Sequence, residues 1–155
     1  MSTSTHDFKD GHGEVPAHQH PNGGGWVADT ATVEGTAYVG ENAKVYGNAY
    51  VLGNAWVCEG AQVSGNARVS GNAKVYGDTK VYENAWVSGN AHVYGSAQVY
   101  GSAQVYGNAY VFVCAQVYGN TRVRERARVS GDAEVYGDAR VFGDAQVSGD
   151  TKVFN

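Results

Sequence analysis

Valine occupies every sixth position from residue 27 to residue 153, without an insertion or a slip. Alanine stands four residues after almost every one of these valines, and a glycine–asparagine or glycine–aspartate pair often precedes the alanine. A unit of this kind repeats without interruption over most of the chain. Such regularity is typical of repeat architectures, in which each unit packs mainly against its neighbours.

The spacing of six predicts short strands joined by tight corners. Alternate side chains of a strand face opposite ways, so Ala43 and Val45 share one face while Lys44 and Tyr46 share the other. Gly47-Asn48 then turns the chain, because glycine and asparagine tolerate a positive φ. We therefore expect about four strand residues and two corner residues per unit, around a narrow core of valine and alanine.

The unit resembles that of hexapeptide-repeat proteins, which fold as left-handed parallel β-helices with an aliphatic residue at one position and a small residue four later. The resemblance covers 26–155 and implies an all-β, single-stranded left-handed parallel β-helix with three sides and about seven coils of 18 residues. The segment 1–25 lacks the repeat and is expected to form a His/Gly-rich cap or tail. The junction between this segment and the repeat, from His20 to Val27, resembles the start of similar β-helices in uncharacterised bacterial and phage proteins.

Composition restricts the partners. The net charge is -4, which gives no general attraction for nucleic-acid polymers or anionic membranes. No apolar run approaches the ~20 residues that a membrane span needs, and the N-terminus has no signal-peptide pattern, so we expect a cytoplasmic protein. Two cysteines do not make a disulfide framework, and Cys58 and Cys114 lie three predicted coils apart, too far for a bond.

An 18-residue coil brings outward residues of successive coils into columns. The first face carries an aromatic column that is interrupted only by Ser64, and its tyrosines are Tyr46, Tyr82, Tyr100, Tyr118 and Tyr136. Stacked rings stabilise neighbouring coils, which explains the column without any partner. The same column also suits a subunit interface, and members of the family commonly form homotrimers. We expect a homo-oligomer, a trimer by preference. Val113 and Cys114 place apolar surface at a corner, which is either a further subunit contact or sequence drift without a role.

A cluster of arginines breaks the regular pattern near the C-terminal end. Its members are Arg122, Arg124, Arg126, Arg128 and Arg140, and Trp86 and Tyr106 precede them in the same columns. Guanidinium groups bind phosphate or carboxylate in a bidentate manner, and aromatic rings stack on bases. The cluster is thus a candidate site for a small, nucleotide-like anion. The alternative is a solvated patch, or one paired with Glu125 and Glu134 or with another subunit.

Histidines gather in the first 25 residues. His18 and His20 are two apart and are the candidates for a metal site, although the flexible composition does not ensure a converging geometry. We expect instead that this segment covers the edge of the first coil, and we expect no metal and no cofactor.

These features favour a non-catalytic, self-associating scaffold or binding module. An alternative is sequestration of a small anionic ligand in clefts between subunits. The resemblance also implies acyltransferase activity as an alternative, but acyltransferases of this fold have a loop that projects from the coils and a histidine base near that loop. Here no loop interrupts 26–155, and His92 is the only histidine after the first repeat, so an enzyme is not expected.

Overall fold

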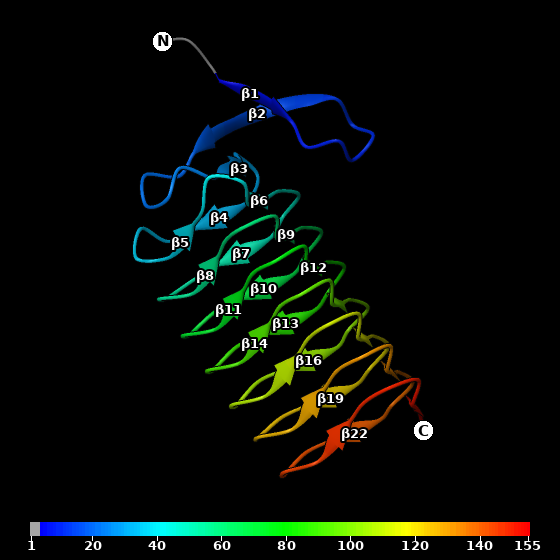
Figure 1. The fold of residues 1–155 in the computed structure, drawn as a ribbon. Coiled ribbons are helices and arrows are strands. Elements are labelled where there is room, and N and C mark those ends of the chain that lie inside the picture. Colours follow the sequence, from blue (N-terminus) through cyan, green and yellow to red (C-terminus); the bar gives the residue numbers. More distant parts are fainter. Residues whose placement is uncertain (1–3) are drawn as a thin grey trace.

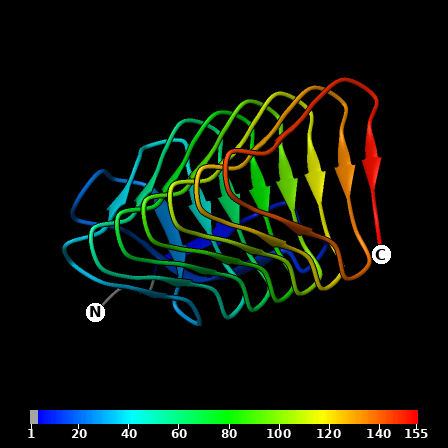
Figure 2. The same cartoon turned by 90° about the horizontal axis from the view of Figure 1, so that it is seen from below.

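The computed structural model describes residues 4–155 as three parallel stacks of short strands, each stack forming one side of a prism (Figure 1). Residues 4–155 contain no helix. The predicted all-β, three-sided fold of about seven coils with an 18-residue repeat is confirmed, since every repeat strand pairs with the strand three elements on. Seen from below, successive coils repeat one outline between the two ends of the stack (Figure 2).

The first face is a ten-stranded sheet that includes the N-terminal segment. Its strands, in spatial order, are β1 (Thr5–Asp7), β2 (Glu14–Gln19), β3 (Trp26–Ala28), β6 (Lys44–Val45), β9 (Gln62–Val63), β12 (Lys80–Val81), β15 (Gln98–Val99), β18 (Gln116–Val117), β21 (Glu134–Val135) and β24 (Lys152–Val153).

The second and third faces are seven-stranded parallel sheets. The second face contains β4 (Thr32–Val33), β7 (Tyr50–Val51), β10 (Arg68–Val69), β13 (Trp86–Val87), β16 (Gln104–Val105), β19 (Arg122–Val123) and β22 (Arg140–Val141). The third contains β5 (Tyr38–Val39), β8 (Trp56–Val57), β11 (Lys74–Val75), β14 (His92–Val93), β17 (Tyr110–Val111), β20 (Arg128–Val129) and β23 (Gln146–Val147).

The interior consists of valine and alanine, as the six-residue spacing predicts. Val45, Val63, Val81 and Val99 are stacked in consecutive coils of the first face and have no exposed surface. The alanines of the repeat are buried with them in one continuous core. Because each valine contacts valines of the coils above and below, the core is a chain of equivalent layers.

The strands are shorter than expected. From β4 onward each contains two residues rather than about four. The backbone hydrogen bonds between coils nevertheless continue past the strand ends, as from the Tyr46 amide to the Val63 carbonyl and from the Asn48 amide to the Gly65 carbonyl. The corners therefore stack in register with the sides, and each turn begins one residue after the valine.

Corner residues adopt the left-handed conformation even where glycine is missing. The φ angles of Glu59, Glu83, Glu125 and Val113 lie between 59° and 63°. At two of these corners the carboxylate compensates for the missing glycine. Glu83 Oε2 accepts a hydrogen bond of 2.7 Å from the Gly101 amide, and Glu125 Oε2 accepts one of 2.7 Å from the Gly143 amide. Each of these glutamates thus connects its corner to the next coil.

The N-terminal segment continues the first face beyond the first coil. β1 pairs antiparallel with β2, β2 pairs antiparallel with β3, and β3 begins the parallel stack (top of Figure 1). Phe8 is buried in a second small core and stacks on Tyr46 with 5.0 Å between ring centroids. His6 stacks on Trp26 at 4.6 Å. Burial, followed by the charge of Lys44, lowers the pKa of His6, so the neutral ring is favoured in this contact.

Candidate functional site

Five aromatic rings form a continuous stack on the first face, which we call the tyrosine ladder. Its members are Tyr82, Tyr100, Tyr118, Tyr136 and Phe154. The ring centroids are 4.9, 4.9, 5.3 and 5.2 Å apart, and neighbouring planes deviate from parallel by 16° at most. Since the rings lie 18 residues apart, each directly after a strand of the first face, the coil spacing itself sets an offset-stacking distance.

Phenol groups of the tyrosine ladder from Tyr82 to Tyr118 are fixed by the neighbouring column of polar side chains. Tyr82 donates to Gln98 Oε1 at 3.2 Å, and Tyr100 donates to Gln116 Oε1 at 3.2 Å. Burial raises the pKa of both tyrosines, with smaller effects from neighbouring charges and phenols, so each hydroxyl remains a donor. Rings and amides together form a stiff, half-buried surface.

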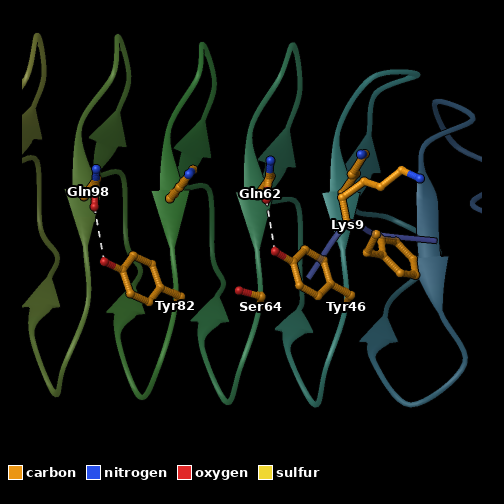
Figure 3. A pocket seen from close by; sticks show the side chains of 9 residues that line it. Lys9, Tyr46, Gln62, Ser64, Tyr82 and Gln98 are labelled. Atoms are coloured by element: carbon orange, nitrogen blue, oxygen red, sulfur yellow. Dashed lines mark hydrogen bonds between the residues drawn. The ribbon is translucent and has the colours of Figure 1, made fainter. Parts of the chain in front are cut away.

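The stack of rings is interrupted one coil before the ladder begins. Ser64 lies between Tyr46 and Tyr82, and the space above it opens to solvent between the two rings (Figure 3). We call this opening the Ser64 gap. Tyr46 is fixed on one side of it by a 3.0 Å hydrogen bond from its hydroxyl to Gln62 Oε1. The gap is lined by Phe8, Lys9, Lys44, Tyr46, Gln62, Ser64, Lys80, Tyr82 and Gln98.

The third face carries a second set of stacked rings. Tyr94 lies 5.0 Å from both Tyr76 and Phe112, and His92 stacks on Tyr110 at 4.9 Å. Burial, and then the charge of Lys74, lowers the pKa of His92. Unlike the tyrosine ladder, this stack continues into charged neighbours, because the Arg128 guanidinium lies over the Tyr110 ring at 5.3 Å.

The five arginines of the predicted anion site do not converge on one edge. Arg124 pairs with Glu125 at 2.7 Å and lies over the Phe142 ring at 4.8 Å. Arg126 pairs with Asp144 at 2.8 Å. Arg128 belongs to the third face, where it covers Tyr110. The corner at 125–126 turns the chain between these side chains, so each arginine contacts the carboxylate or ring nearest to it.

Arg122 and Arg140 are the two members that remain together. They occupy neighbouring strands, β19 and β22, and are both exposed. Within residues 4–155 neither forms an ion pair. They line one shallow depression with Ser102, Gln104, Asn120 and Asp138.

Trp86 and Tyr106 lie in the expected columns but not around a common ligand space. The Arg68 guanidinium lies 5.0 Å from the Trp86 ring and 5.1 Å from the Tyr50 ring, and Gln104 separates Trp86 from Arg122. Tyr106 is in the column of Arg124, which is directed to Phe142 in the next coil.

Comparison with known proteins agrees with the repeat. Residues 43–59, 61–77, 85–101 and 133–149 match the family model described as the YdcK beta solenoid repeat. The chain is a β-solenoid repeat protein. No curated protein and no solved structure matches it. The matched stretches contribute strands to all three faces, and they include Tyr100 and Tyr136 of the tyrosine ladder. At the Ser64 gap they include Tyr46 and Ser64 but not Tyr82.

The two histidines proposed for a metal site have other partners in the solenoid. His18 Nδ1 lies 2.8 Å from Asp29 Oδ1 on the surface. His20 is buried, and its Nε2 lies 2.9 Å from the Ala37 carbonyl oxygen. They are thus directed to different atoms. Among residues 4–155 no group of three or more histidine, cysteine or acidic side chains is arranged for a metal, and no helix could cross a membrane.

The remaining predicted contacts lie on corners and edges of the solenoid. Val113 and Cys114 are exposed at a corner next to Phe112, and both cysteines are free thiols. Burial, and then the charge of Glu59, raises the pKa of the Cys58 thiol, which disfavours the reactive thiolate.

Two residues of the gap could not be assigned from the repeat. Phe8 and Lys9 come from the N-terminal hairpin, yet they lie beside Tyr46 and line the Ser64 gap. The only signal in the sequence is that Phe8 is an isolated large apolar residue within a polar segment. Its position depends on the antiparallel pairing of β1, β2 and β3, which no periodicity reports.

Proposed function

We propose that this β-solenoid is a non-catalytic scaffold that associates with copies of itself through the tyrosine ladder, with a homotrimer as the expected assembly. The observation that carries the proposal is the uncharged centre of the first face. Gln98, Tyr100, Gln116 and Tyr118 lie there in two columns, all half-buried and free of ionised groups. Interface centres are depleted of charge and enriched in tyrosine, and this surface has that composition.

The stiffness of the ladder supports association. Its rings are stacked, and the phenols of Tyr82, Tyr100 and Tyr118 are hydrogen-bonded, so ordering them against a partner removes little side-chain freedom. Charged side chains begin only at the margins of the surface, with Lys80 at one side and Glu134 at the other. Corners of constant length keep the face flat, because no loop projects from it between residues 26 and 155.

The test is the oligomeric state of the purified chain and of a double variant, Tyr118→Ser/Tyr136→Ser. Serine already occupies this column at Ser64, so the coils accept it. We expect a trimer in sedimentation velocity for the parent chain at micromolar concentration and a monomer for the variant. The matched control, Tyr94→Ser/Phe112→Ser, removes two stacked rings from the third face and is expected to remain a trimer.

A monomeric parent chain, or dissociation of the control as readily as of the ladder variant, would refute self-association through the first face.

We propose a second candidate function, binding of a small anion at Arg122 and Arg140. The favouring observation is that two like charges are held on adjacent strands without a carboxylate partner among the described residues. Such a pair repels itself and is relieved by a bidentate phosphate ligand. Asp138 lines the same depression, but among the described residues it forms no ion pair with either arginine. Its Oδ1 accepts a hydrogen bond from the Asn120 side chain.

A melting assay with a nucleotide panel tests this site. We expect at least one nucleotide to raise the melting temperature of the parent chain, and the Arg122→Gln/Arg140→Gln variant to lose the shift. Arg68→Gln is the matched control, since Arg68 lies in the same column but is held between two rings. No shift for any nucleotide, or an equal shift in the double variant, argues against the site.

A further inference from the structure

We propose that the Ser64 gap is a binding site for a planar aromatic anion, a site separate from the association surface and from the arginine pair. The inference starts from the missing ring. In the first-face column, the positions one coil before and one coil after Ser64 carry Tyr46 and Tyr82, and Ser64 leaves between them the space of one aromatic side chain (Figure 3).

The width of the gap matches one guest ring. Stacked rings in this column are 4.9 Å apart per coil, as between Tyr82 and Tyr100. Tyr46 and Tyr82 are two coils apart, which places their rings roughly 10 Å apart at the usual strand spacing. A guest ring midway would therefore meet each tyrosine at the same offset-stacking distance that the ladder uses.

The two walls of the gap are fixed before any ligand arrives. The Tyr46 hydroxyl donates to Gln62 and the Tyr82 hydroxyl donates to Gln98, so neither ring is free to turn and close the space. Phe8 of the N-terminal hairpin stacks on Tyr46, which further restrains that ring. A preformed slot of this kind requires little reorganisation on binding.

The charge around the gap is positive. Lys44 and Lys80 flank Gln62 on the neighbouring strands β6 and β12, and within residues 4–155 neither forms an ion pair. Lys9 adds a third ammonium group, although it is paired with Asp7 at 3.0 Å. Among the described residues 4–155, no acidic side chain lines the gap. An anionic group on the guest, directed toward Gln62, would lie between the two unpaired lysines, while the ring stacks on the tyrosines.

The experiment is calorimetric titration with naphthalene-2-sulfonate, a planar aromatic anion. Two comparison probes separate the contributions: cyclohexanesulfonate has the charge without the aromatic ring, and 2-naphthol has the ring without the charge at pH 7. We expect naphthalene-2-sulfonate to bind at least tenfold more tightly than either. Failure of the aromatic anion to bind, or equal affinity for cyclohexanesulfonate, would overturn the proposal.

Filling the gap from within gives the sharper test. The Ser64→Tyr variant restores the ring that the column carries in the neighbouring coils. We expect it to reduce the affinity for naphthalene-2-sulfonate at least tenfold and to melt at a higher temperature than the parent chain, which distinguishes blocking from unfolding. Ser64→Ala keeps the space and should bind as the parent does. Ser70→Tyr adds a tyrosine on the second face and should leave binding unchanged.

The lysines and the association surface are tested separately. The Lys44→Gln/Lys80→Gln variant should bind naphthalene-2-sulfonate no more tightly than 2-naphthol. The Tyr118→Ser/Tyr136→Ser variant should bind it as the parent chain does, so loss of self-association and loss of binding are independent results. If Ser64→Tyr binds as the parent does, or if it dissociates an oligomer without added ligand, the gap is not a small-molecule site.

Discussion

Val99→Asp is expected to abolish cooperative folding of the chain. Val99 is fully buried in the middle of the stack, between Val81 and Val117 in the adjacent coils. A carboxylate there loses its hydration and gains no partner, because the surrounding core consists of valine and alanine. Buried unpaired charges are among the few single changes that cost more than about 4 kcal/mol, a large fraction of the stability of an ordinary domain.

Urea unfolding followed by circular dichroism measures this effect. Val153→Asp is the matched control, since Val153 lies at the same repeat position in β24 but is partly exposed, and it should cost far less. Val99→Thr keeps the shape and adds one hydroxyl, and we expect an intermediate loss of about 1–2 kcal/mol. Equal stability of the two aspartate variants would mean that the valines do not share one dry interior.

Gly77→Val is expected to produce the second-largest loss of stability. Gly77 has a φ of 76°, where a β-branched side chain is strained. A Cβ added there would lie 2.6 Å from the Gly95 carbonyl oxygen in the next coil. That oxygen accepts the hydrogen bond that the Asp78 amide donates between the two coils. Relieving the clash separates two corners, so we expect a cost of roughly 3 kcal/mol, the sum of backbone strain and a broken hydrogen bond.

Gly149→Val separates the two causes. Gly149 has a similar φ of 65°, but no atom of the described part of the chain lies within 4 Å of an added Cβ. This variant should therefore show only the strain, about 1–2 kcal/mol. Denaturation midpoints of the two variants give the difference directly, and equal losses would show that the close stacking of corners has no energetic weight.

Replacement of Val113 by glycine tests the same backbone strain, because it should raise stability where Gly77→Val and Gly149→Val lower it. Val113 has a φ of 63° and is 48% exposed, so Val113→Gly relieves a strained backbone and removes few contacts. We expect the free energy of unfolding to rise by about 1 kcal/mol, after subtraction of the entropy that glycine adds to the unfolded chain. Glu83→Gly should show no such gain, because it also removes the hydrogen bond from the Gly101 amide to the carboxylate.

Much of the fold could be predicted because it depends on local periodicity. Alternation within a strand decides that valine and alanine face inward. The resemblance to hexapeptide-repeat proteins implies three such units per coil, so that residues 18 apart stack in columns. The tyrosine ladder and its interruption at Ser64 follow from this counting. The length of the strands did not follow, since it depends on where the corner backbone leaves the extended conformation.

The details of the surface depended on tertiary contacts. Arg124, Arg126 and Arg128 occupy alternate positions in the sequence, yet their partners are Glu125, Asp144 and Tyr110. A long side chain takes the nearest opposite charge or ring, and the corner decides which of these is near. The sequence could place the arginines in columns but could not choose among their neighbours.

The sequence by itself determined the valine and alanine core, because that core arises from a six-residue pattern that repeats without interruption. The three sides, and with them the aromatic columns, followed from the resemblance of that repeat to hexapeptide-repeat proteins. Only the tertiary structure decided how residues 4–25 cover the first coil, bringing Phe8 against Tyr46 and Lys9 to the Ser64 gap. The physical reason is that antiparallel pairing of the hairpin with β3 is a single, non-repeated contact. It is set by packing and backbone hydrogen bonds between distant residues, and no periodic signal encodes it.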